Sequence, residues 1–337
     1  MAITGLNKIF DPVVFWPMLI SFIISFIGMK FGLPVLKKLH LGQYEREEGP
    51  EAHKKKAGTP TMGGIIFLIT STVTAVIFLI YFAASKTDYT GFTKIIPVML
   101  VTLGFGVIGF LDDFIKIKMK RNMGLTSLQK MAGEVIVTLA FVIYLVGFSG
   151  LGTYTVIPFS GYVWDAPAWF YVICMFIIIL GTVNGSNFTD GLDGLLSSVT
   201  IVIGAFLIYA GICAGSMTAA YSAIMTGALI AFLWFNSYPA KVFMGDSGSL
   251  AIGGFVASAS YMLRMPIFIA IIAVIYLVEI LSVMIQVAYF KKTGGKRIFK
   301  MSPLHHHYEL SGWHESKVVS IFTIVTVIAC IIAALAM

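Results

Sequence analysis

The chain has 337 residues, of which 58% are hydrophobic and only 12% are charged, and its formal net charge is +7. An ordinary water-soluble domain is excluded, because roughly a quarter of the residues in such domains are charged. A helix needs about 20 apolar residues to cross a bilayer, and runs of that length recur along the chain. The composition therefore indicates a polytopic membrane protein.

The apolar runs predict an all-α fold with a single domain over residues 1–337. Polar connections of very different length separate the runs. We expect ten transmembrane helices, near residues 13–36, 63–83, 95–111, 131–149, 167–184, 195–213, 219–236, 248–263, 266–290 and 317–337. One of the outer connections, 150–166, has the alternating pattern and glycines of a short β-hairpin.

The distribution of basic residues predicts the orientation. Seventeen Lys and Arg residues fall in the odd-numbered connections and three in the even-numbered ones. Because cytoplasmic loops carry the excess of Lys and Arg, the odd connections are predicted to be cytoplasmic and both termini to lie outside. We expect the basic face to attract anionic lipid headgroups or an anionic soluble substrate.

The segment Asn184–Leu195, NGSNFTDGLDGL, places carboxylates between two apolar runs and contains no basic residue. Since a carboxylate beside a bilayer core is costly, it marks a candidate functional site. Asn184, Asn187, Asp190 and Asp193 recur every three residues, which predicts that they share one face of a helical turn.

Two further motifs carry acids at predicted membrane edges, LDDFIK (111–116) and FMGDSGSL (243–250). In the first, Asp112, Lys116 and Lys120 are spaced four apart and share a helical face. A solvated helix end is the alternative interpretation of this motif. In the second, Asp246 has no adjacent Lys or Arg with which to pair. Acids and cations together suit a site that handles phosphate and metal.

Two more cytoplasmic motifs suit a polyanion. In KKKAGTPTMGG (54–64), the lysines are either a membrane anchor or, with the glycines, a phosphate-binding loop. In PLHHHYE (303–309), three consecutive histidines suggest either a transition-metal site or contact with a polyanion. Consecutive residues of a regular element cannot all point at one ion, so we favour the polyanion.

These motifs together predict a metal-dependent transferase at the cytoplasmic membrane surface. Clustered carboxylates without nearby thiols favour a hard cation such as Mg²⁺, bound by one or two acids and by substrate phosphates. The lysines and glycines favour a diphosphate. An enzyme that joins a soluble, nucleotide-linked substrate to a membrane lipid needs this set of groups at this interface.

The motifs GTPTMGG, LDDFIK, NFTDGLDGL, FMGDSGSL and PLHHHYE, in this order over ten predicted helices, resemble the phospho-N-acetylmuramoyl-pentapeptide transferase family. This family lies within the polyprenyl-phosphate N-acetylhexosamine-1-phosphate transferase superfamily. The resemblance implies transfer of phospho-N-acetylmuramoyl-pentapeptide from its UDP conjugate to undecaprenyl phosphate, which yields lipid I and UMP for peptidoglycan synthesis. It also implies Mg²⁺, a homodimer, a location in the bacterial cytoplasmic membrane and no nucleic-acid partner.

The resemblance also implies the site residues. The catalytic acids are expected to be Asp112, Asp113 and Asp246, with Asp246 binding the metal. Phe243 is the expected stacking surface for uracil. The substrate-binding residues are expected to be Lys56, Lys116, Lys120, Asn187, Asp190, Gly191, Leu192, Asp193, Asn236, Phe243, His305, His306 and His307.

Several alternatives stay open at this stage. The lipid phosphate attacks the sugar-linked phosphorus directly, or Asp113 or Asp112 forms a covalent intermediate. The donor is the muramoyl-pentapeptide conjugate or, in a related branch, UDP-N-acetylglucosamine. A lipid transporter is the alternative class, because Glu279 lies inside a predicted helix. Glu279 is either a buried acid that is hydrogen-bonded within the protein or part of a proton relay.

Overall fold

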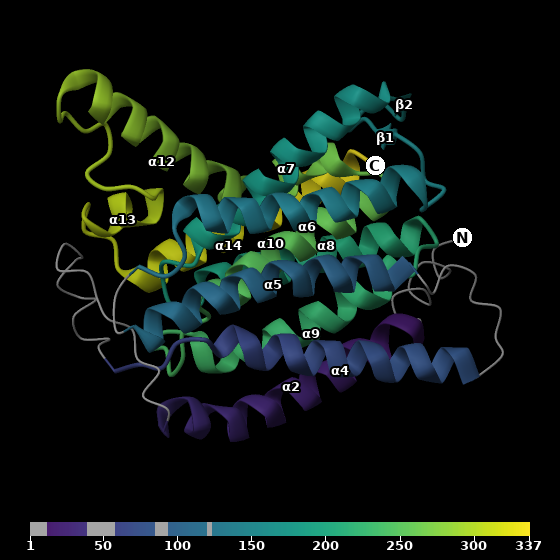
Figure 1. Cartoon of the computed structure of the whole chain (residues 1–337), viewed down its shortest axis with the longest axis horizontal. Coiled ribbons are helices and arrows are strands. Elements are labelled where there is room, and N and C mark those ends of the chain that lie inside the picture. The colour runs from purple at the N-terminus through teal and green to yellow at the C-terminus, as the bar shows by residue number, and fades with distance from the viewer. Residues whose placement is uncertain (1–11, 39–57, 85–93, 120–122) are drawn as a thin grey trace.

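The protein is a bundle of helices, shown in Figure 1 as a computed structural model that describes residues 12–38, 58–84, 94–119 and 123–337. Short elements connect the long helices at both ends of the bundle. The helices are α2 (Pro12–Lys38), α4 (Gly63–Ala84), α5 (Ile95–Lys118), α6 (Ser127–Gly147), α7 (Ala168–Thr189), α8 (Leu195–Cys213), α9 (Thr218–Asn236), α10 (Asp246–Met262), η2 (Pro266–Phe268), α11 (Ile269–Ile272), α12 (Val274–Thr293), α13 (Leu304–Glu309) and α14 (Glu315–Leu335).

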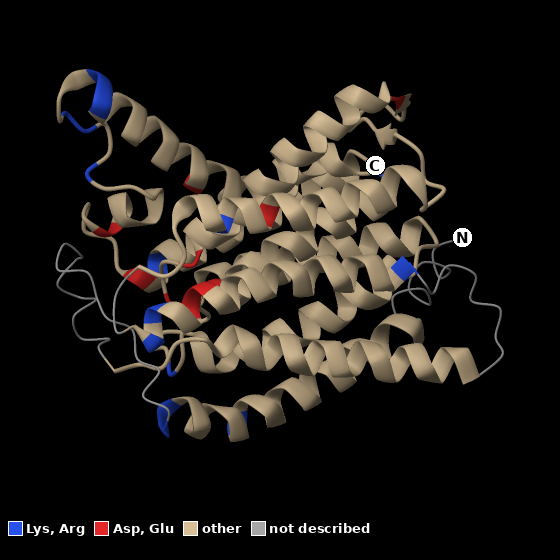
Figure 2. Ribbon diagram, viewed as in Figure 1, with Lys and Arg blue, Asp and Glu red and all other residues tan. Residues whose placement is uncertain are grey.

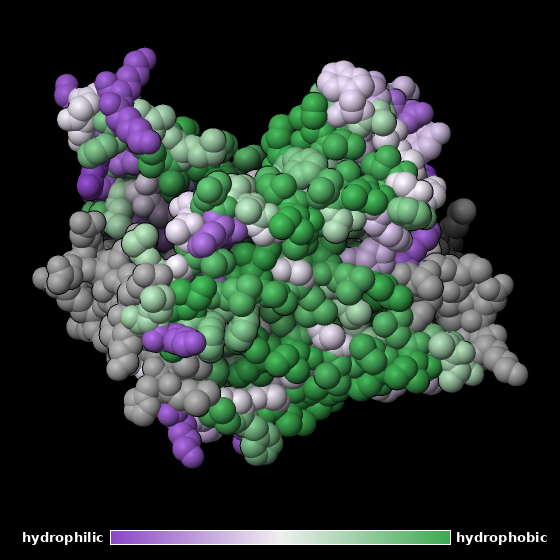
Figure 3. All heavy atoms as spheres, in the orientation of Figure 1, coloured by the Kyte–Doolittle hydropathy of each residue, from purple (hydrophilic) through white to green (hydrophobic). Residues whose placement is uncertain are grey.

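Within the described ranges, nine helices are long and apolar enough to cross a membrane, which confirms a polytopic all-α membrane protein. They are α2, α4, α5, α6, α7, α8, α9, α12 and α14. The predicted segment 248–263 corresponds to α10, which is shorter, with 17 residues. Figure 3 shows hydrophobic side chains over the middle of the bundle and hydrophilic ones toward its ends.

The prediction of one continuous helix over 266–290 is wrong. The chain forms η2, then the short α11, and only then α12, because Ala273 adopts φ −105° and ψ 33°, outside the helical region. No glycine or proline stands at this position to signal the break. The helix predicted over 95–111 also continues farther, to Lys118, so that the acid motif lies on its last turns.

Helix α10 forms the centre of the bundle, and every residue from Ser247 to Met262 is buried. Small residues allow its neighbours to approach closely. A side chain at Gly64 of α4 would collide with the backbone of Gly248, and one at Gly109 of α5 would collide with the carbonyl of Asp246. The packing therefore fixes the first turn of α10 against α5.

The hairpin predicted over 150–166 is confirmed as β1 (Tyr154–Val156) and β2 (Val163–Asp165), which pair antiparallel with Thr155 opposite Trp164. It lies at the same end of the bundle as the C-terminus (Figure 1).

The opposite end of the bundle gathers most of the charged residues of the described part (Figure 2). Helices α2, α5 and α12 each end there with two lysines in the last turn. The folded chain thereby brings the acidic, basic and histidine motifs to one end.

Candidate functional site

Three aspartates from two helices meet at the charged end. Asp112 and Asp113 lie on the last turns of α5, and Asp246 is the first residue of α10. One carboxylate oxygen from each lies within 4.8 Å of the others. Among the described residues, this is the only group of three or more acidic, His or Cys side chains close enough to share a metal ion.

Asp113 anchors α10. Its carboxylate accepts hydrogen bonds from the backbone N–H of Asp246 (3.2 Å), the backbone N–H of Ser247 (2.9 Å) and the Ser247 hydroxyl (2.9 Å). The first N–H groups of a helix have no partner within it, so Asp113 supplies one from α5. Gly245, at φ 77°, permits this approach, because a Cβ there would lie 2.6 Å from Asp113 Oδ2.

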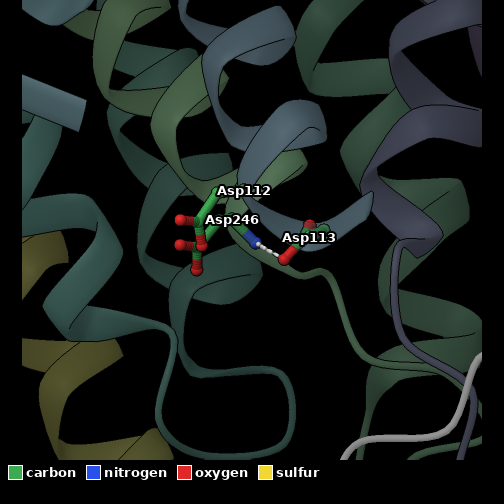
Figure 4. A group of neighbouring side chains, drawn as sticks. All are labelled: Asp112, Asp113 and Asp246. Atoms are coloured by element: carbon green, nitrogen blue, oxygen red, sulfur yellow. Dashed lines mark hydrogen bonds between the residues drawn. The ribbon is translucent and has the colours of Figure 1, made fainter. Parts of the chain in front are cut away.

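Asp112 points away from Asp113 and toward the carboxylate of Asp246 (Figure 4). Its Oδ1 accepts a hydrogen bond from the backbone N–H of Leu125 at 2.7 Å, and its Oδ2 lies 2.5 Å from Lys116 Nζ. The Asp112 and Lys116 pair therefore has the predicted four-residue helical spacing.

Asp246 is the most accessible of the three acids, with 21% of its side chain exposed against 5% for Asp112 and Asp113. Its Oδ2 lies 3.2 Å from Lys116 Nζ and 3.0 Å from Lys130 Nζ. Its Oδ1 accepts a hydrogen bond from Asn187 Nδ2 at 3.1 Å. Three elements, α5, α6 and α7, thus converge on this one carboxylate.

Sequence reasoning missed Lys130 as a site residue, because it placed Lys130 in a loop before a helix starting at 131. The signal was present, since Thr126 and Gln129 form the capping box that starts α6 at Ser127. A helix that begins there carries Lys130 in its first turn, beside the acids.

The predicted common face of Asn184, Asn187, Asp190 and Asp193 is wrong beyond Thr189, where α7 ends. Asp190 leaves the helical region at φ −80° and ψ 48°, and the chain then turns. Asn187 stays on the helix and donates to Asp246 and, at 2.8 Å, to Ser249 Oγ. Burial raises the pKa of Asp190 well above its ordinary range, and the negative charges of Asp246 and Asp113 raise it further.

Several predicted substrate-binding residues instead hold the turn and the 236–246 loop together. Asp193 Oδ2 accepts from the backbone N–H of Ala240 at 2.9 Å, and Asn236 Nδ2 donates to the Val242 carbonyl at 3.0 Å. The Leu192 side chain is buried in the hydrophobic core. The structure therefore gives these three side chains contacts within the protein, and their contact with substrate stays a prediction.

Phe243 lies next to the glycine motif. Its backbone N–H donates to the Pro60 carbonyl at 2.8 Å, and its own carbonyl accepts from Gly63 N–H at 2.9 Å. Phe243 is half-buried, and its contact with a nucleotide stays a prediction. Lys56 and Lys120 lie outside the described residues.

The three histidines of α13 face different partners. The ring of His305 is buried, and it lies so close to Gly191 that any side chain at residue 191 would collide with it. His306 Nδ1 lies 2.8 Å from Glu309, and His307 Nδ1 accepts from the Lys300 N–H at 3.1 Å. In the described structure they form no shared metal site, and His305 contacts the turn after α7.

Glu279 is a buried acid that is hydrogen-bonded within the protein. It accepts from the backbone N–H groups of Leu304 at 2.7 Å and His305 at 3.1 Å, and so anchors the start of α13.

The three-aspartate cluster has the donors that a hard cation prefers. Its oxygens come from carboxylates alone, and no thiol is among them. The Lys116 ammonium lies within 3.8 Å of an oxygen of each aspartate, so a positive charge already fits among them. The arrangement can therefore balance the charge of a phosphate ligand with the two lysines and a bound divalent cation.

Comparison with known proteins supports the resemblance seen in the motifs. The family model "Glycosyl transferase family 4" matches residues 95–264, and "Phospho-N-acetylmuramoyl-pentapeptide-transferase signature 1" matches residues 56–68. Proteins named phospho-N-acetylmuramoyl-pentapeptide-transferase are similar over nearly the whole chain. The relative from Shouchella clausii is 45% identical over 94% of this chain and 96% of its own. That from Halalkalibacterium halodurans is 45% identical over 96% and 97%, and that from Clostridium novyi 44% over 96% and 96%. The chain belongs to the phospho-N-acetylmuramoyl-pentapeptide-transferase family.

Proposed function

We propose that the protein transfers phospho-N-acetylmuramoyl-pentapeptide from its UDP conjugate to undecaprenyl phosphate, forming lipid I and UMP. The convergence of Asp112, Asp246, Lys116 and Lys130 at the charged end of a membrane bundle carries the proposal. A site there meets a soluble nucleotide from the water and a lipid phosphate from the membrane. The names and full-length similarity of the relatives support this substrate pair.

The reaction brings together two polyanions, so charge balance is the main obstacle. Lys116 and Lys130 lie where they can hold the diphosphate of the nucleotide and the phosphate of the lipid in contact. Fixed charges in a partly dehydrated site stabilise a transition state without costly reorganisation. Mg²⁺, held by Asp246 and Asp112, would offset further phosphate charge when it is bound.

We favour direct attack of a lipid phosphate oxygen on the sugar-linked phosphorus, with cleavage of its bond to the UMP oxygen. The lipid phosphate has a second pKa near ~6, so it is mostly a dianion at neutral pH and needs little help from a base. Asp112, beside Asp246, is the candidate for that help.

The surroundings of Asp113 argue against the covalent alternative for that residue. Its two oxygens accept three hydrogen bonds and its side chain is only 5% exposed. A carboxylate tied in this way is a poor nucleophile. We therefore assign Asp113 to positioning Asp246.

The nucleotide would lie over the turn after α7 and the loop before α10. Phe243 offers a ring for stacking on uracil, and we assign Asp190 and Gly191 to the same pocket. We further propose ten membrane crossings, with α10 as the tenth, both termini outside, a homodimer, and a location in the bacterial cytoplasmic membrane.

The test is UMP release by the purified protein in detergent with undecaprenyl phosphate and Mg²⁺. UDP-N-acetylmuramoyl-pentapeptide and UDP-N-acetylglucosamine are compared, and EDTA is added to a parallel sample. We expect UMP from the pentapeptide donor alone and none with EDTA. Release from UDP-N-acetylglucosamine alone would assign the protein to the other branch, and release that persists in EDTA would contradict the metal.

A further inference from the structure

Another buried acid, Glu134, lies near the site and has no part in the proposed chemistry. It is fully buried in α6, two turns from the start of the helix. Its Oε2 accepts a hydrogen bond from Asn184 Nδ2 at 2.7 Å, whereas its Oε1 has no hydrogen-bond partner in the described structure. Because a carboxylate inside a membrane helix is costly, its presence calls for a functional reason.

The bond between Glu134 and Asn184 lies one helical turn below the reactive cluster on both helices. On α6, Lys130 precedes Glu134 by four residues, and its ammonium lies 3.0 Å from Asp246. On α7, Asn187 follows Asn184 by three residues, and its amide lies 3.1 Å from Asp246. The hydrogen bond between Glu134 and Asn184 therefore lies one helical turn from Lys130 and Asn187, the two side chains that α6 and α7 direct to Asp246.

From this geometry we propose that Glu134 is a positioning residue, which joins α6 to α7 through Asn184 and so holds Lys130 and Asn187 against Asp246. The inference rests on the proposed transferase function for its effect on turnover. A neutral glutamine at residue 134 would accept a similar hydrogen bond from Asn184.

Removal of either partner should lower kcat more than it changes KM, because Lys130 and Asn187 lose their alignment at Asp246 while the Phe243 ring expected to stack on the base is not touched. We expect Glu134→Leu and Asn184→Ala each to lower kcat about 10- to 100-fold, the usual effect of losing a residue that positions another group of the site. The double variant should be no worse than the poorer single variant, because both changes break one link. Glu134→Gln, which keeps an acceptor, should lose less than Glu134→Leu.

An exchange of the two groups gives the sharpest test. Asn184→Asp alone places two carboxylates face to face and should lower kcat about 100-fold. Glu134→Gln combined with Asn184→Asp rebuilds an amide–carboxylate pair and should recover about tenfold or more of that loss. Thr138→Val is the matched control. Thr138 is buried one turn farther along α6, its hydroxyl has no partner in the described part, and we expect kcat to stay within about twofold.

Three results would overturn the inference. They are a Glu134→Leu enzyme within about twofold of the wild-type kcat, losses that multiply in the double variant, and an exchanged pair no more active than Asn184→Asp. Failure of the proposed function looks different, because the wild type itself would then release no UMP. Thermal unfolding of the same single and double variants would still report the link, and additive shifts of the unfolding midpoint would refute it.

Discussion

Asp113 and Glu279 each use a buried carboxylate to hold the first backbone N–H groups of a helix that follows later in the chain. Asp113 on α5 holds α10, and Glu279 on α12 holds α13. Their neighbours differ. Asp113 adjoins two further acids, and Lys116 and Lys130 reach the same cluster, whereas Glu279 adjoins the ring of His305.

The comparison shows that burial of an acid in a membrane helix does not by itself identify a reactive group. In both regions the buried acid fixes a backbone. At the end of α5, the anchored helix begins with Asp246, a second acid that stays accessible and paired with cations. At α13, the anchored helix brings a histidine against Gly191. We infer a reaction centre in the first region and a wall of the substrate site in the second.

The largest expected effect is that of Asp246→Ala. The variant loses the accessible carboxylate on which Lys116, Lys130 and Asn187 converge, so we expect UMP release to fall about 10³-fold or more. Asp165→Ala, in the hairpin of β1 and β2 at the other end of the bundle, is the control and should keep full activity. A fully active Asp246→Ala enzyme would show that the cluster is not the reaction centre.

The isosteric variants Asp112→Asn and Asp113→Asn separate the two adjacent acids. Asp112→Asn should lower kcat about 10²-fold, the lower end of the range for loss of a general base, because a phosphate dianion needs little such help, and it should change the unfolding midpoint little. Asp113→Asn replaces an acceptor by a donor and leaves an N–H of α10 unpaired, so it should also lower the free energy of unfolding by about 1–3 kcal/mol. Thermal unfolding and kcat are measured on the same samples. Equal stability of the two variants would contradict the anchoring role of Asp113.

Glu279→Ala should act through the fold of α13. Loss of the carboxylate leaves the N–H groups of Leu304 and His305 unpaired, which should cost about 1–3 kcal/mol of stability. We expect KM for the nucleotide donor to rise about tenfold and kcat to change less, because outer-shell partners act at this scale. Ser282→Ala, one turn along α12, is the control. A loss confined to kcat would contradict this assignment and would indicate that Glu279 acts in the reaction centre.

Phe243→Leu is expected to have the smallest effect. Stacking of a base on an aromatic ring contributes about 1–3 kcal/mol, so loss of the ring should raise KM for the nucleotide donor about tenfold and leave kcat near the wild-type value. Phe243→Tyr keeps the ring and should bind normally. An unchanged KM in Phe243→Leu would exclude stacking on this residue.

The membrane class, the positions of most of the long helices and the hairpin within 150–166 could be predicted from the sequence, because each rests on a local pattern. Apolar runs mark helices, and alternation between glycines marks the hairpin. The break at Ala273 could not be predicted, since no local residue signals it. The end of α7 at Thr189 was missed because three-residue spacing continues through the turn that follows.

Which residues form the site was partly predictable from the sequence, but the separate role of each residue was not. The motifs identified Asp112, Asp113 and Asp246. Only the folded chain shows that the Asp113 carboxylate accepts hydrogen bonds from α10, whereas Asp112 faces Asp246. Lys130 and Glu134 were missed as site residues because their roles depend on contacts with α10 and α7, far away in the sequence. No local pattern marks the contact of Glu134, whereas the capping box of Thr126 and Gln129 was a local signal that α6 begins before Lys130.

The most direct test of this comparison is to measure Mn²⁺ binding, as a probe for Mg²⁺, by electron paramagnetic resonance on the purified protein in detergent without substrate. The wild type, Asp246→Ala and Glu279→Gln are compared. We predict that the wild type and Glu279→Gln bind the ion and that Asp246→Ala does not. Equal binding by wild type and Asp246→Ala would contradict the assignment of the reaction centre to the three aspartates.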